Sequence, residues 1–211
     1  MKKRWNTIAA ELKEHAPFTI LGAVSGIILM LIFRNIAHHT SHKLFYFFHP
    51  THVVLSALVT TAMFCLHVKK PKFISVLVVG YIGAIGIATL SDSVIPFAGE
   101  LLLNLHAHAH IGFIEAWYIV NPAALLGILI GYFWPRTKFP HAGHVLLSTW
   151  ASAFHMLMAF DGNVDFGKLF TSFIFLFLSV WLPCCVSDIL FPLLFTNSDK
   201  KISHHHGSES D

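Results

Sequence analysis

The sequence predicts an all-α polytopic membrane protein whose six transmembrane helices form a 3+3 inverted-topology repeat. Three observations lead to this fold class. Of the 211 residues, 55% are hydrophobic and only 12% are charged, whereas a soluble domain carries about 25% charged residues. Six apolar segments recur along the chain, each about long enough to cross a roughly 30 Å hydrocarbon core as a helix. Finally, three short residue patterns occur twice, in the same order along the chain.

The apolar segments divide the chain. They lie at 17–33, 49–68, 73–90, 111–133 or 120–133, 143–160 and 169–195. Helix is the expected conformation, because strands of a membrane barrel would be about ten residues long with alternating polarity. The stretch 94–105 fits a surface helix, a re-entrant piece or an extension of the third segment. The expected divisions are a cytoplasmic N-terminal segment (1–16), a first three-helix repeat (17–105), an outer His segment with the second repeat (106–196), and a disordered cytoplasmic tail (197–211).

Lysine and arginine residues predict the orientation. With the N-terminus in the cytoplasm, only Arg34, Lys43 and Lys168 of the 14 Lys and Arg residues fall on outer loops. This distribution follows the positive-inside rule. We therefore expect a multi-pass protein of the cell (inner) membrane with both termini in the cytoplasm. The net charge of +3 is small and scattered, so the lipid bilayer is the expected partner and nucleic acid is not.

The repeated patterns predict an internal duplication. P-x3-L-G-x3-G spans 17–26 and 122–131, H-x-x-H-V-x-L-S spans 49–56 and 141–148, and S-D-x3-P spans 91–96 and 187–192. Chance in an apolar sequence could explain the Leu-Gly pattern alone, but His, Asp and Ser are not the abundant residues. Because each half would hold three spans, the second half would enter the membrane upside down, as in many transporters.

The repeated His, Asp and Ser residues are the candidate site. Ionisable residues inside a membrane are costly and usually mark function, and two His in H-x-x-H lie about one helical turn apart on one face. The residues predicted to line an ion path are Ser56, Ser91, Asp92, Ser148, Ser187 and Asp188. The residues predicted to bind metal are His49, His52, His141, His144, Asp92, Asp188, His106, His108, His110 and Glu115. This mixed nitrogen and oxygen set suits Zn, Mn, Fe, Co or Ni.

The charge distribution places the two H-x-x-H pairs near opposite faces of the membrane, as two stations of one path. The alternative is that these His and Asp residues are helix caps and interfacial anchors. The cluster His106, His108 and His110, with Glu115, has no counterpart in the second half and fits either an added outer cation site or a solvated loop. His155 is interpreted as a buried core histidine in preference to a proton-coupling group.

These features favour an alternating-access transporter for a divalent transition-metal ion or another small ion. An integral-membrane metalloenzyme, a hydrolase or oxygenase with an outer-face His/Asp metal site, is the main alternative. A passive channel or a scaffolding subunit is a third. No nucleotide-binding loop is present in the sequence, so ATP is not the expected driving force. A small homo-oligomer is expected, because six spans enclose little pathway by themselves.

Overall fold

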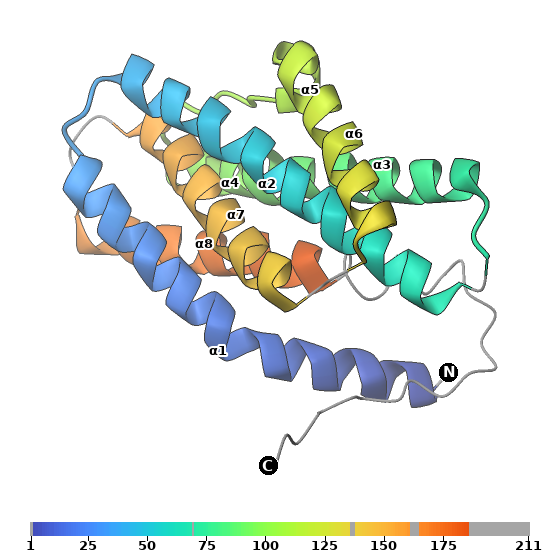
Figure 1. Cartoon of the computed structure of the whole chain (residues 1–211). Coiled ribbons are helices and arrows are strands. Elements are labelled where there is room, and N and C mark those ends of the chain that lie inside the picture. Colours follow the sequence, from blue (N-terminus) through green and yellow to red (C-terminus); the bar gives the residue numbers. More distant parts are fainter. Residues whose placement is uncertain (1, 69, 136–137, 161–164, 186–211) are drawn as a thin grey trace, which may run out of the picture.

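The computed structural model describes residues 2–68, 70–135, 138–160 and 165–185, and these residues form helices and no strand (Figure 1). The elements are α1 (Lys2–Phe33), α2 (His38–His67), α3 (Phe73–Thr89), the π-helical turn η1 (Leu90–Val94), α4 (Ile95–Leu102), α5 (Gly112–Glu115), α6 (Trp117–Phe133), α7 (Lys138–Ala159) and α8 (Phe166–Cys185). Each of the six apolar segments predicted from the sequence contributes a helix to this set.

Four stretches in the described part of the chain are long and apolar enough to cross a membrane: Ala16–Phe33, His38–His67, Phe73–Leu102 and Phe166–Pro183. Trp117–Phe133 is a shorter apolar helix. Large apolar side chains such as Leu21, Ile74 and Phe133 are exposed on the outer helices. An exposed apolar surface of this kind fits contact with lipid.

The stretch 94–105 extends the third apolar segment, which was one of the three expected alternatives. α3, η1 and α4 follow each other without a break from Phe73 to Leu102. The wide turn η1 includes a bond in which the Ile95 N–H donates to the Leu90 carbonyl, five residues back. Pro96 has no N–H to donate. The Ser91 carbonyl therefore has no donor from the next turn of its own helix.

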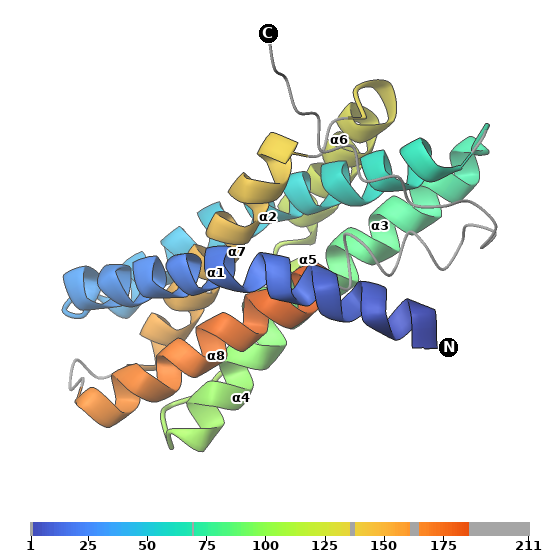
Figure 2. The ribbon, with the colours of Figure 1, turned by 90° about the horizontal axis from the view of Figure 1, so that it is seen from below.

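α2 and α7 form the centre of the molecule, where they pack against each other (Figure 1). α1 packs on α7 and α8, and α8 also contacts α4, as seen from below in Figure 2. On the other side, α6 packs on α2 and α3. Residues 151–159 of α7 are all buried. The central helices are therefore shielded, and they carry most of the buried polar side chains.

Glycines let the outer helices approach the central ones closely. On α1, a Cβ added at Gly22 would lie 3.0 Å from Thr149 Oγ1, and one added at Gly26 would lie 3.7 Å from the Cβ of Ala153. α1 thus packs on α7 through two glycines one turn apart. Small residues at such contacts are typical of helix packing in membranes, where van der Waals contact is a main source of association.

α6 approaches α2 in the same way. A Cβ added at Gly127 would overlap the carbonyl oxygen of Val54 and lie 2.8 Å from the Cβ of Ala57. A Cβ at Gly131 would lie 3.0 Å from the Cβ of Thr61. Because the overlapping atom at Gly127 belongs to the backbone, any side chain there would force α6 away from α2.

Candidate functional site

A buried carboxylate, Asp92, connects the two histidines of the first H-x-x-H pattern. Its Oδ2 lies 2.9 Å from His49 Nδ1 and 2.7 Å from His52 Nδ1. All three side chains are buried. An ionised carboxylate can only accept hydrogen bonds, so both imidazoles donate through Nδ1. In the neutral form of each imidazole, the lone pair is then on Nε2.

The second carboxylate oxygen of Asp92 accepts two hydroxyl hydrogens. Ser91 Oγ donates to Asp92 Oδ1 at 2.7 Å, and Ser148 Oγ of α7 donates to the same atom at 2.8 Å. The carboxylate therefore accepts four hydrogen bonds, about the number of lone-pair directions that it offers. These bonds offset the cost of burying the charge, and those to Nδ1 fix the orientation of both histidines.

The π-helical turn positions Asp92, and α7 stabilises the turn. The Ser152 hydroxyl of α7 lies 2.9 Å from the Ser91 carbonyl and 2.9 Å from the Ser148 carbonyl of its own helix, and the two carbonyls share its one hydrogen. The Ser91 carbonyl is the one that Pro96 and the wide turn leave without a backbone donor. π-turns of this kind are frequent at functional sites. The repeated pattern S-D-x3-P thus has a physical meaning here: it breaks the regular helix at the residue that carries the buried charge.

The Nε2 atoms of His49 and His52 are buried and have no hydrogen-bond partner in the described part of the chain. A buried nitrogen lone pair without a partner is costly. Gly112, at the start of α5, lies against the Nε2 edge of His49, and a Cβ added there would overlap it. Phe45 covers the same ring by stacking at a centroid distance of 5.2 Å. The geometry thus presents two imidazole lone pairs in a protected position.

His144 of the second H-x-x-H pattern joins this cluster. Its ring centroid lies 4.6 Å from that of His52, and its side chain is fully buried. The charge distribution predicts that these histidines lie at stations near opposite faces, but the structure brings His52 and His144 together with Asp92 and Ser148. The positions of Lys and Arg predict on which side of the membrane each helix ends. They do not predict how far His52 and His144 lie from each other, because that distance depends on how α2 and α7 cross.

Of the remaining predicted residues of the repeats, the structure describes only some. Ser56 is buried in α2, and its hydroxyl has no hydrogen-bond partner among the described residues. His141 belongs to α7, but its side chain lies outside the described part of the structure. Ser187 and Asp188 also lie outside the described residues. Their predicted roles stay predictions.

A second buried pair was not predicted from the sequence as a pair. His155 Nδ1 lies 2.7 Å from Glu100 Oε1, and both side chains are buried. The other ring nitrogen of His155, Nε2, accepts the backbone N–H of His110 at 3.4 Å. His155 is therefore a satisfied buried histidine, as the sequence favoured. The signal for its partner was present, because Glu100 is a carboxylate within an apolar stretch.

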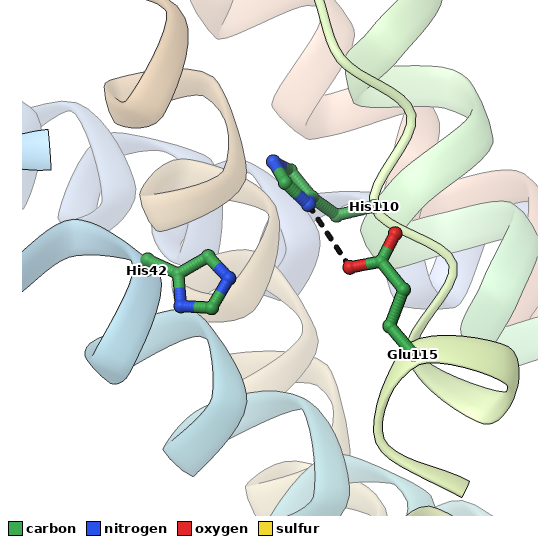
Figure 3. A group of neighbouring side chains, drawn as sticks. All are labelled: His42, His110 and Glu115. Atoms are coloured by element: carbon green, nitrogen blue, oxygen red, sulfur yellow. Dashed lines mark hydrogen bonds and ion pairs between the residues drawn. The ribbon is translucent and has the colours of Figure 1, made fainter. Parts of the chain in front are cut away.

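The segment 103–111 and α5 form a more exposed polar group. His110 Nδ1 lies 3.1 Å from Glu115 Oε2, and His42 of α2 approaches both side chains (Figure 3). His106 and His108 are exposed and are not part of this group. The structure thus groups two residues of the predicted outer cluster and adds His42, which was not among the predicted ligands.

The comparisons with known proteins found no match: no protein-family model matches the chain, and neither a curated protein nor a solved structure does. The function therefore has to be argued from the site itself.

Proposed function

We propose that the protein is an alternating-access membrane transporter for a divalent transition-metal ion, and that the buried cluster around Asp92 is the substrate site. The observation that carries the proposal is the shared carboxylate. Asp92 accepts a hydrogen bond from Nδ1 of His49 and of His52, and the buried Nε2 atoms have no partner among the described residues. A carboxylate behind an imidazole is the usual support of a metal-binding histidine.

The donors fit the proposed substrate. Imidazole nitrogen suits Zn, Fe, Co and Ni, whereas Ca and Mg prefer oxygen ligands. In the proposal, His49 and His52 bind the ion through Nε2, and His144 supplies a ligand from the second half. Asp92 holds both Nδ1 protons and supplies one negative charge close to the cation. This differs from the sequence-based role of Asp92, which was direct ligation.

The inverted repeat remains part of the proposal, and the packing supports it. The repeat relates Gly22 to Gly127 by an offset of 105 and Ala57 to Thr149 by an offset of 92. In the structure, Gly22 packs on Thr149 and Gly127 packs on Ala57. One turn later, the second glycines of the two patterns do the same: Gly26 packs on Ala153 and Gly131 packs on Thr61. Related glycines thus meet related residues, as a pseudo-two-fold axis requires.

The same axis would place the site where transporters bind their substrates. α2 and α7 are the second helices of the two halves, and they pack on each other beside η1, where the regular hydrogen-bond pattern of the continuous helix 73–102 is interrupted. Transporters with inverted repeats bind substrate at the repeat interface, often at interrupted helices. The bonds from Ser148 to Asp92 and from Ser152 to the Ser91 carbonyl cross between the halves. Rocking of one half against the other would break these bonds and allow others to form.

A membrane metalloenzyme is the second candidate, and one observation favours it. The ring centroids of His52 and His144, one from each half, lie 4.6 Å apart, and a catalytic metal needs ligands from different elements to lie close together. The charge distribution alone places the two H-x-x-H pairs near opposite faces of the membrane, which would not favour a single catalytic centre. The enzyme would bind metal at His49 and His52 without moving it across the bilayer.

Metal flux into proteoliposomes tests the proposal. Purified protein is reconstituted, and uptake of Zn, Mn, Fe, Co and Ni is measured with an indicator inside the vesicles. His52→Gln is expected to lower flux at least about tenfold. His67→Gln is the matched control, because His67 is an exposed histidine on the same helix, and its Nδ1 bonds to the Met63 carbonyl.

The outcomes separate the candidates. Flux lost in His52→Gln and retained in His67→Gln supports transport through the buried site. Equal flux in both variants overturns the proposed substrate site. Metal binding that depends on His52, without flux of any of the five ions, favours the enzyme. Asp188→Asn adds a test of the repeat, which predicts that this variant also lowers flux.

A further inference from the structure

His42, His110 and Glu115 converge although they come from three separate elements. His42 lies near the start of α2, His110 ends the segment 103–111, and Glu115 ends α5 (Figure 3). One ligand atom from each residue can be chosen so that all three atoms lie within 4.8 Å of one another. Among the described residues, this is the group of His, Cys, Asp or Glu side chains that meets this condition.

Surrounding contacts hold the three side chains in place. Glu115 Oε2 accepts hydrogen bonds from His110 Nδ1 and from the Tyr46 hydroxyl. The other carboxylate oxygen accepts the backbone N–H of Ile111 at 3.2 Å. The His42 ring lies against Tyr46 at a centroid distance of 4.6 Å and meets the His110 ring edge-on at 5.5 Å. The arrangement is thus partly formed before any ion binds.

The chemistry of the group fits a transition metal with an exchangeable water. Two imidazoles and one carboxylate are a ligand set found in zinc sites that keep an open position. Partial burial raises the pKa of Glu115, but hydrogen bonds from Tyr46 and His110 outweigh it and leave the pKa below its usual range. The carboxyl is therefore ionised at neutral pH. The side chains of Glu115 and His110 are 40% and 18% exposed, so water and ions reach them.

We propose that His42, His110 and Glu115 form a second, solvent-accessible site for a divalent transition-metal ion, with Tyr46 orienting the carboxylate. Ligands bound at about 2.0–2.2 Å lie roughly 3–3.5 Å apart. The side chains must therefore close by about 1 Å, which small rotations supply. When the ion binds, His110 takes the tautomer with its proton on Nε2, and the ion replaces the hydrogen bond between Nδ1 and Glu115 and binds the carboxylate directly.

The site also lies next to the buried centre. Phe45 is buried between them: its ring stacks on His49 at 5.2 Å and lies 6.5 Å from the His110 ring. This position suits a site that captures an ion before it reaches His49. The capture role rests on the proposed transport function, whereas ion binding at the exposed site does not.

Binding is measured with Zn²⁺ by calorimetry and with Co²⁺ by visible absorption, using the full chain in detergent micelles. The tail residues His204, His205 and His206 are replaced by Ser in every sample, because adjacent imidazoles bind metal by themselves. The test variants are His42→Asn, His110→Asn and Glu115→Gln. His108→Asn is the matched control, because His108 is in the same segment but outside the group.

Each test variant is expected to weaken one binding event about tenfold or more and to remove its Co²⁺ absorption band, while His108→Asn changes neither. Binding that survives all three variants, or that is lost equally in His108→Asn, overturns the site. His52→Gln serves as a background that removes metal binding at the buried site, so failure of one site is distinguishable from failure of the other.

The capture role is tested by metal flux. Glu115→Gln should raise the metal concentration at which flux is half-maximal and leave the maximal rate unchanged. An unchanged half-saturating concentration overturns capture alone.

Discussion

Asp92→Asn tests the central feature of the buried site, the shared carboxylate. The substitution keeps the size and shape of the side chain but removes its charge. The amide oxygen can still accept from Nδ1 of His49 and His52, and the amide nitrogen can donate to the hydroxyls of Ser91 and Ser148. The number of hydrogen bonds is thus conserved, and the change isolates the effect of the negative charge.

The expected magnitude follows from the two bonds to imidazole. A hydrogen bond to a charged group contributes about 1.5–3 kcal/mol and a neutral one about 1 kcal/mol. Losing the charge on two such bonds costs about 2 kcal/mol, and about 1.4 kcal/mol is a factor of ten in affinity. Metal affinity at the buried site should therefore fall about 30-fold, within the range of about 10–100 found when such supporting groups are changed.

Calorimetric titration with Zn²⁺ in the Glu115→Gln background measures this effect, because that background removes the exposed site. Ser148→Ala is the control: it deletes one hydrogen bond to Asp92 and keeps the charge, so a fall of about fivefold is expected for about 1 kcal/mol. Circular dichroism checks that both variants keep their helices. An Asp92→Asn affinity equal to that of the parent, or no weaker than that of Ser148→Ala, would refute the charge argument.

Three further predictions concern two glycine contacts and the pH dependence of metal binding. Gly112→Ala should weaken metal binding at the buried site, because the added methyl group would overlap the Nε2 edge of His49. Gly86→Ala should leave the metal affinity unchanged, because the space around Gly86 is open. Calorimetric titration of both variants with Zn²⁺ measures the difference. Gly127→Ala should lower the free energy of unfolding by about 1–3 kcal/mol, since overpacking forces backbone shifts, and a denaturation midpoint equal to that of the parent would contradict the close contact. Metal affinity at the exposed site should fall as the pH decreases from about 7 to 5, because imidazoles must be neutral to bind; the lowered pKa of Glu115 keeps this carboxylate ionised in that range. Calorimetry at several pH values measures the effect, and an affinity that does not change with pH would contradict imidazole ligation.

The sequence predicted the helices well, because the signal is local. An apolar segment must form a helix to satisfy its own backbone inside a bilayer. Each of the six segments contributes a helix, and four stretches of the described residues are long and apolar enough to cross a membrane. The path of 94–105 was left open, because one π-turn at Asp92 decides whether the chain leaves the helix axis or continues along it.

The sequence by itself also determined which residue types make up the candidate sites: the His, Asp and Ser residues of the repeated patterns and the His110 and Glu115 region. Only the tertiary structure decided how they combine. It brought His52 and His144 together, made Asp92 a shared support for two imidazoles, paired Glu100 with His155 and added His42 to the exposed group. The physical reason is that chain spacing fixes which side chains share a helix face, whereas contacts between helices depend on how α2, α7 and the segment 103–111 pack.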